Sequence, residues 1–130
     1  TVERKLMFIV TGASKGLGKA ICSRLIENNM QVLGLARDTS DLPFESINCD
    51  VSSADEVRSV TKLIRKQKYN VTGIINAAGI ASMNLALTTP STIAEKIMQT
   101  NLLGTIYCCQ NFAPLLIRNK KGQKNGSIIY

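Results

Sequence analysis

The 130-residue sequence contains no histidine. Without that side chain, the chain cannot by itself build a Ser-His-Asp triad, a Cys-His pair or a histidine-ligated zinc site. We therefore expect no metal site. No apolar run approaches the roughly 20 residues that a membrane-spanning helix requires, and we expect no membrane partner. With 45% hydrophobic and 19% charged residues, the composition is that of a single folded domain.

Acidic side chains are scarce, since nine stand against sixteen basic ones and leave a formal net charge of +7. Such a balance can attract nucleic acid, an anionic membrane or a phosphorylated small ligand. The basic residues late in two predicted helices complement the helix dipole without any partner. They are Lys62, Arg65, Lys66 and Lys68, then Arg118, Lys120 and Lys121. No aromatic residues interleave with them, so the pattern favours the small ligand, and only the net charge supports nucleic acid.

Cysteines are few and none forms a Cys-x-x-Cys pair. The four are Cys22, Cys49, Cys108 and Cys109, and three of them lie within apolar stretches, where a free thiol behaves as a small hydrophobe. Cys108 and Cys109 are adjacent, which suits neither a disulfide staple nor a metal clip. The pattern indicates a reduced, cytoplasmic protein.

Short apolar runs alternate with helical patterns along the sequence. The runs predict strands buried on both faces, at residues 6–10, 31–36, 46–49, 71–75 and 127–130. One helix ends at Asn28-Asn29, one begins at the capping box Ser53-Ala54-Asp55-Glu56, and one runs from Ser91 to Pro114. Strict alternation predicts an α/β fold, a doubly wound parallel sheet that is incomplete at its fifth strand.

Three apolar helix faces are expected to point into the core. They are Leu17, Ala20, Ile21 and Leu25; then Val57, Val60 and Ile64; and finally Ile97, Met98, Leu102, Thr105, Ile106 and Cys109. Asn101 interrupts the last face, where Asn is a poor helix former. Its position indicates a kink or a water-binding site.

Three glycines, Gly12, Gly16 and Gly18, separate the first strand from the first helix. Backbone amides at a helix N-terminus point at an anion, and glycines let a pyrophosphate approach the backbone. The loop does not end in Gly-Lys-Ser/Thr, which excludes a P-loop. Its place at the head of a strand-helix-strand unit favours dinucleotide binding over turn and packing roles alone.

The spacing Thr11-Gly12-x-x-x-Gly16-x-Gly18 resembles the short-chain dehydrogenase/reductase family. Three more matches follow in that family's order: Asp50-Val51, Asn76-Ala77-Ala78-Gly79 and Asn101. The resemblance covers the whole sequence, although Ala77 stands where the family frequently has a second Asn. It implies a Rossmann-like dinucleotide-binding domain over residues 1–130, the N-terminal half of a single-domain enzyme.

The resemblance also implies roles for individual residues. Asp50 would contact the adenine of a nicotinamide dinucleotide, Asn76 would lie near the adenine ribose, and Asn101 would belong to a catalytic Asn-Ser-Tyr-Lys set. The implied cofactor-binding residues are Gly12, Ser14, Lys15, Gly16, Leu17, Gly18, Arg37, Asp50, Val51, Asn76, Ala77, Ala78 and Gly79. The family transfers a hydride between nicotinamide and a carbonyl or alcohol carbon, so a small-molecule substrate of that class is implied.

The end of the second strand indicates which dinucleotide is bound. Ala36 stands where the family's NAD members carry an acid, and Arg37 follows at once. With Lys15 in the glycine loop, two cations would converge on a 2′-phosphate, which favours NADP. Asp38 is the opposing signal, because it lies about twenty residues beyond Gly18, where the NAD acid is expected. NAD is therefore kept as the alternative.

The family's catalytic Ser follows the fifth strand, and its Tyr-x-x-x-Lys pair lies on the next helix. Tyr130 falls within the predicted fifth strand, before either, and Ser127 is also too early. Residues 1–130 are therefore expected to bind the cofactor without turnover. A non-catalytic NADP(H)-binding module is the alternative. Family members often pair through the long helix, so a homo-oligomer is compatible with the sequence.

Overall fold

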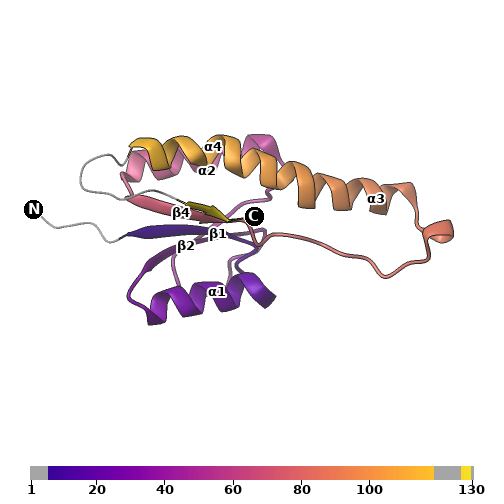
Figure 1. Ribbon diagram of the computed structural model, residues 1–130, viewed down its shortest axis with the longest axis horizontal. Helices are drawn as coiled ribbons and strands as arrows, with labels where there is room; N and C mark the ends of the chain where they lie inside the picture. The colour runs from indigo at the N-terminus through magenta and orange to yellow at the C-terminus, as the bar shows by residue number, and fades with distance from the viewer. Residues whose placement is uncertain (1–5, 119–126, 130) are drawn as a thin grey trace, which may run out of the picture.

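The computed structural model describes residues 6–118 and 127–129 (Figure 1). The strands are β1 (Met7–Thr11), β2 (Gln31–Ala36), β3 (Ser46–Asn48), β4 (Val71–Ile75) and β5 (Ser127–Ile129). The helices are α1 (Gly16–Glu27), α2 (Ala54–Gln67), the 3₁₀ turn η1 (Ala86–Thr88), α3 (Ser91–Met98), the π-helical segment η2 (Gln99–Leu103) and α4 (Gly104–Arg118). Within the described residues, every predicted strand is present to within one residue. Residues 119–126, with two of the predicted helix-end lysines, and Tyr130 lie outside them.

The five strands form one parallel sheet in the order β3-β2-β1-β4-β5. Helix α1 covers one face of the sheet, and α2 and α4 lie together on the other (Figure 1). The predicted doubly wound, Rossmann-like fold is thereby confirmed. In such a sheet the strand order reverses beside β1, and the crevice at the carboxyl ends of β1 and β4 is where ligands bind.

Successive strand residues face opposite sides and supply two cores. The larger core lies against α2 and α4, and its largest side chains are Met7, Ile9, Leu33, Leu35, Ile64, Ile74 and Phe112. The smaller core lies against α1 and contains Val10, Ala13, Cys22, Val32 and Ile75. Val57, Val60 and Ile64 of α2 are all buried, so the inward face predicted for that helix is confirmed.

The inward face predicted for α1 is wrong in part. Leu17 is 72% exposed and Ala20 is also exposed, while Gly18 and Cys22 are the buried residues. The helix starts so close to the strand before it that a Cβ at Gly18 would lie 2.0 Å from the carbonyl oxygen of Gly12. Only a glycine fits at that contact, and it sets the buried face one residue away from the one predicted.

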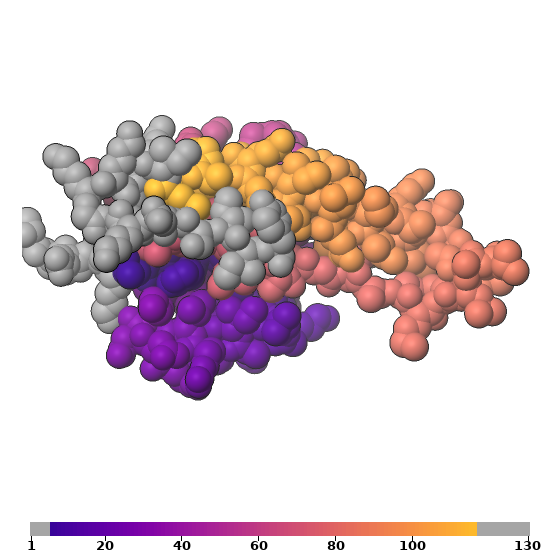
Figure 2. Space-filling view, viewed as in Figure 1, coloured from indigo at the N-terminus to yellow at the C-terminus, as the bar shows by residue number. Residues whose placement is uncertain are grey.

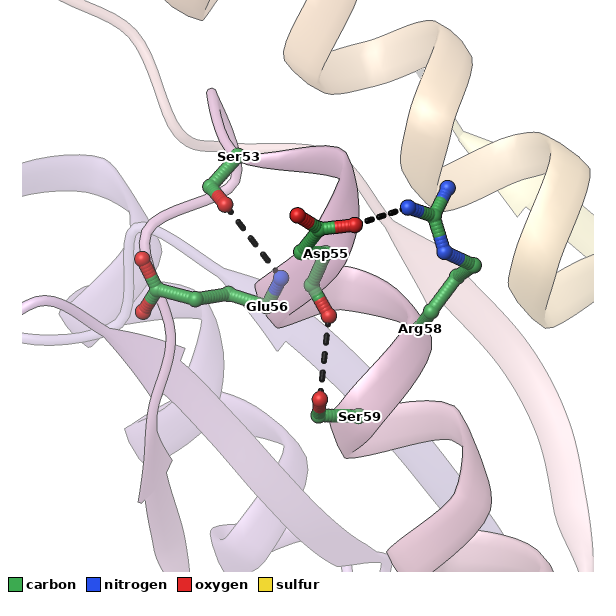
Figure 3. A network of polar contacts seen from close by, with 5 residues as sticks. All are labelled: Ser53, Asp55, Glu56, Arg58 and Ser59. Atoms are coloured by element: carbon green, nitrogen blue, oxygen red, sulfur yellow. Dashed lines mark hydrogen bonds and ion pairs between the residues drawn. The ribbon is translucent and has the colours of Figure 1, made fainter.

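Helix α2 begins with the predicted cap, but only half of the capping box forms. The Ser53 hydroxyl accepts a hydrogen bond from the Glu56 backbone N–H at 3.3 Å (Figure 3). The Glu56 carboxylate does not return to the Ser53 N–H, as a capping box requires. It accepts instead from the Asp50 N–H, at 3.2 Å, while the Ser53 N–H donates to the Asp50 carbonyl. The cap is therefore tied to the segment that follows β3.

The apolar stripe predicted on the long helix does not form the core. Met98 is 54% and Leu102 47% exposed, and the buried residues are instead Gly104, Cys108, Phe112 and Leu115. The π-helical segment η2 changes the helical phase between α3 and α4, which a uniform 3.6-residue pattern does not anticipate. The predicted end at Pro114 is also wrong, because that proline lies inside α4.

An arm connects β4 to α3. Residues 81–88 are all exposed, and the segment stands clear of the sheet with the outer end of α3 (Figures 1 and 2). Met83 and Leu87 make almost no contact with the rest of the chain, being about fully exposed. In the part of the chain that the structure describes, no helix combines the length and apolar character needed to cross a membrane.

Three thiols are buried, and their burial makes the stability of the folded protein sensitive to alkaline pH. Burial raises the pKa of Cys22 to about 11 and those of Cys49 and Cys108 to about 12, from an ordinary value of 9.0. The folded protein therefore holds these protons over a range in which the unfolded chain releases them. Stability from this source is complete below pH 9 and declines above it.

We expect the free energy of unfolding to fall between pH 9 and 11 by at most about 1.4 kcal/mol per pH unit for each buried thiol. Urea titrations of the natural protein at half-unit pH steps measure this slope. Replacing Cys22 by Ala should make this slope shallower, because one buried thiol no longer titrates. The tyrosine and lysine titrations are common to both proteins and cancel in the comparison. Identical slopes for the two proteins would show that the buried Cys22 thiol does not contribute to the pH dependence of stability.

Candidate functional site

A pocket of about 750 Å³ opens at the carboxyl edge of the sheet. Its walls come from the loops after β1, β2, β3 and β4 and from the helical segments α3 and η2. Because the strands are parallel, these loops lie at one edge, where open α/β sheets bind ligands. Its volume is in the range of small-molecule and cofactor sites.

The pocket brings together all the predicted cofactor-binding residues except Asn76. They are Gly12, Ser14, Lys15, Gly16, Leu17, Gly18, Arg37, Asp50, Val51, Ala77, Ala78 and Gly79. They come from four separate loops, so their convergence depends on the strand order of the sheet. Their role toward a cofactor stays a prediction at this point.

The glycine loop has the backbone geometry that an anion site needs. Gly12 has φ +64° and packs on the next loop, where a Cβ would lie 2.7 Å from the Ala78 Cα. Gly16 has φ +59°, but a Cβ there would meet nothing within 4 Å, so the space beside it is open. Lys15 precedes α1 without a side-chain cap, and the first turn of α1 carries no acidic residue. The α1 N-terminus is therefore left positive on the pocket side.

Thr11 joins the loops after β1 and β4. Its buried hydroxyl accepts hydrogen bonds from the backbone N–H groups of Ala77, at 3.1 Å, and Ala78, at 3.0 Å. Both N–H groups belong to the pocket wall that faces the glycine loop. One hydroxyl thus holds two walls of the pocket in register.

Cationic side chains of the glycine loop and of the residue after β2 line the pocket. They are Lys15 and Arg37, both exposed, and Ala36 at the end of β2 also lines it. Asp38 is not among the lining residues: its carboxylate accepts from the Ser40 N–H at 3.0 Å and from the Ser40 hydroxyl. Those hydrogen bonds lower the pKa of Asp38 below its ordinary value of 3.8. The acid that follows β2 in the sequence is therefore engaged in a turn with Ser40.

The segment after β3 is held by local hydrogen bonds. The Asp50 carboxylate accepts from the Ser52 N–H at 3.0 Å and from the Ser52 hydroxyl at 2.6 Å. Its own N–H is held by Glu56, as described above. Val51 packs against α4, where a Cβ on Gly104 would lie 2.9 Å from Val51 Cγ2.

The two predicted asparagines lie outside the pocket lining. The Asn76 side-chain nitrogen lies 3.7 Å from the Cys109 sulfur on α4. The Asn101 side chain clamps Ile80, accepting from its N–H and donating to its carbonyl, both at 2.8 Å. Asn101 lies within the π-helical segment η2, and Ile80 itself lines the pocket. The catalytic role implied for Asn101 stays a prediction.

Sequence reasoning missed the wall that α3 and η2 contribute. The additional lining residues are Leu35, Cys49, Ser52, Ile80, Thr92, Glu95, Lys96, Gln99 and Thr100. Thr92, Glu95, Lys96 and Gln99 follow helical spacing and form one polar face, which is the signal that could have found them.

The Cys49 thiol lines the pocket but is not a nucleophile. Burial, with the nearby charges of Glu56 and Asp50, raises its pKa to about 12, so it is protonated near neutral pH. The pocket therefore offers backbone amides, three cations, two carboxylates and apolar surface, which suit a phosphorylated ligand with a flat apolar part.

The fold is Rossmann-like, and comparison with known proteins specifies the family of the chain. A family model described as short chain dehydrogenase matches residues 6–130. The chain belongs to the family of short chain dehydrogenases.

Known relatives and solved structures agree with this membership. Carbonyl reductase family member 4 of Xenopus tropicalis is 30% identical over 128 residues, covering 92% of this chain and 52% of the relative. Farnesol dehydrogenase of Aedes aegypti is 30% identical over 136 residues, covering 94% and 54%. Ligand-free aldohexose dehydrogenase of Thermoplasma acidophilum superposes with a TM-score of 0.85 at 31% identity, covering 96% of this chain and 48% of that one. The chain thus spans about half the length of the curated relatives it matches.

Replacing Thr11 by Val should destabilise the protein by about 1–3 kcal/mol, because the Ala77 and Ala78 N–H groups lose a buried acceptor. Thr11→Ser keeps the hydroxyl and should cost less than about 1 kcal/mol. Urea unfolding measures the difference, and amide hydrogen exchange at Ala77 and Ala78 should accelerate in the Val variant alone. Equal effects of the two substitutions would show that the hydroxyl does not hold the loops.

Proposed function

We propose that this protein is an NADP(H)-dependent oxidoreductase that transfers a hydride between nicotinamide and the carbonyl or alcohol carbon of a small molecule. In this proposal residues 1–130 are the dinucleotide-binding half of a single-domain enzyme. The observation that carries it is that the cations Lys15 and Arg37 line the pocket while Asp38, the acid that follows β2, is engaged with Ser40.

The glycine loop fits a pyrophosphate. The open space at Gly16 and the uncapped α1 N-terminus, described above, place backbone amides beside a solvent-accessible cradle. By contrast, the N-terminus of α2 already has a Ser53 cap and two acids, Asp55 and Glu56, in its first turn (Figure 3). Of these two helix starts, the first is the one suited to an anion.

The pair Lys15 and Arg37 supports NADP over NAD. A ribose 2′-phosphate needs cationic partners, and an arginine can hold it through two parallel hydrogen bonds. An acid that bound the 2′-hydroxyl of NAD would have to face the pocket, and Asp38 faces Ser40 instead. A relative at 25% identity and a TM-score of 0.85, RhlG of Pseudomonas aeruginosa, was solved as a complex with NADP.

The other walls would hold the rest of the adenosine half. Asp50 and Val51 would border the adenine, and Ala77 to Gly79 would border the path toward the nicotinamide. The bound cofactor would supply the hydride. Asn101 would act by fixing Ile80 and the η2 backbone, whereas the family's Ser and Tyr-x-x-x-Lys would come from residues outside this sequence.

A second function, an NADP(H)-binding module without catalysis, is separated from the first by one observation. The intact mass of the protein as its source cell produces it should be near twice the 14.1 kDa of this sequence if a catalytic half is present. A mass near 14.1 kDa would favour the binding module. We propose that either form is cytoplasmic. Homo-oligomer formation is compatible with both forms.

Replacing Arg37 by Glu should weaken NADPH binding by roughly ten- to hundredfold, because a charge-assisted contact is lost and a repulsion is added. NADH binding should change much less. Calorimetric titration of the natural protein with both cofactors measures the difference. Lys62→Glu, an exposed site on α2, makes the same change in net charge and should leave both affinities unaltered. Equal losses for NADPH and NADH would overturn the NADP assignment.

A further inference from the structure

The Gln99 side chain in η2 contacts the loop after β3. Its side-chain nitrogen donates to the Ser52 carbonyl at 2.8 Å and lies 3.5 Å from the Tyr107 hydroxyl. Gln99 and Ser52 are half-buried, and both line the pocket. The hydrogen bond therefore spans from one wall of the pocket to another.

Ser52 is hydrogen-bonded both to Gln99 and to a charged group. Its N–H and hydroxyl both donate to the Asp50 carboxylate, as described above, while its carbonyl accepts from Gln99. Ser52 thus connects the helical segment η2 to the Asp50 carboxylate. A shift of the Ser52 peptide would move or release the Asp50 side chain.

The side chains of η2 contact two different loops of the pocket. In η2, Gln99 contacts the loop after β3 while Asn101 clamps Ile80 in the loop after β4. One short segment therefore grips two pocket walls, and close packing of Gly104 on Val51 fixes its distance from the first of them.

We propose that Gln99 is a positioning residue for the adenosine end of the cofactor, acting through Ser52 on the Asp50 carboxylate. This rests on the proposed function, because it requires that the pocket bind a dinucleotide. Gln99 contributes to the affinity for the adenosine half of the cofactor.

The test uses Gln99→Met, which keeps the length of the side chain and removes its donor. Isothermal titration of the natural protein with NADPH and NADH first identifies the preferred cofactor, and the matching adenosine fragment, 2′,5′-ADP or 5′-AMP, is then titrated. We expect the dissociation constant of that fragment to rise about five- to tenfold, the effect of one lost hydrogen bond. Gln110→Ala, at an exposed glutamine on α4, is the matched control and should change nothing.

A double-mutant cycle separates positioning from a general structural effect. If Gln99 acts through Asp50, the loss caused by Gln99→Met should shrink to less than twofold in an Asp50→Ala background. A wild-type affinity in Gln99→Met, or a loss that persists undiminished without Asp50, overturns this inference and leaves the proposed function standing. If the wild-type protein binds neither NADPH nor NADH, the proposed function itself fails. Should Gln99→Met not fold, Gln99→Asn, one methylene shorter, removes the same contact.

Discussion

The pocket depends on how closely the loops after β1 and β4 approach each other. Gly12 leaves no room for a side chain against the Ala78 backbone, and the Thr11 hydroxyl occupies the remaining gap as a shared acceptor. The parallel register of β1 with β4 brings these loops to the same edge. Because this contact consists of backbone packing at Gly12 and one buried hydroxyl at Thr11, the mouth of the pocket has little dependence on flexible side chains.

Around this fixed centre, the remaining walls are attached by individual polar side chains. Glu56 holds the Asp50 N–H, Asn101 holds Ile80, and Gln99 holds Ser52. Each of these bonds crosses between elements that are adjacent in space. Each hydrogen bond of this kind contributes about 1 kcal/mol to holding these loops in place.

The sequence was sufficient to predict the sheet, the glycine loop and most of the pocket lining, because strand burial and glycine spacing are local signals. It was insufficient wherever two elements meet. Leu17 follows helical periodicity, yet the close approach of Gly18 to Gly12 turns it outward. Met98 belongs to a regular apolar stripe, yet the π-helical segment rotates the α4 face that packs on the sheet. Asp38 has the spacing of a ribose-binding acid, and only the turn with Ser40 shows where its carboxylate lies.

The amino-terminal and carboxyl-terminal edges of the sheet differ in how much sequence change they tolerate. Among the described residues, neither the turn at 28–30 nor the turn at 68–70 contributes to the pocket lining. Both reverse the chain through a residue with positive φ, Asn29 at 61° and Lys68 at 55°. Over evolutionary time, substitutions and short insertions should accumulate at this amino-terminal edge, because they disturb only a solvent-facing turn. The carboxyl edge has no such latitude, so divergent copies of this gene should resemble one another most in their loops after β1 and β4.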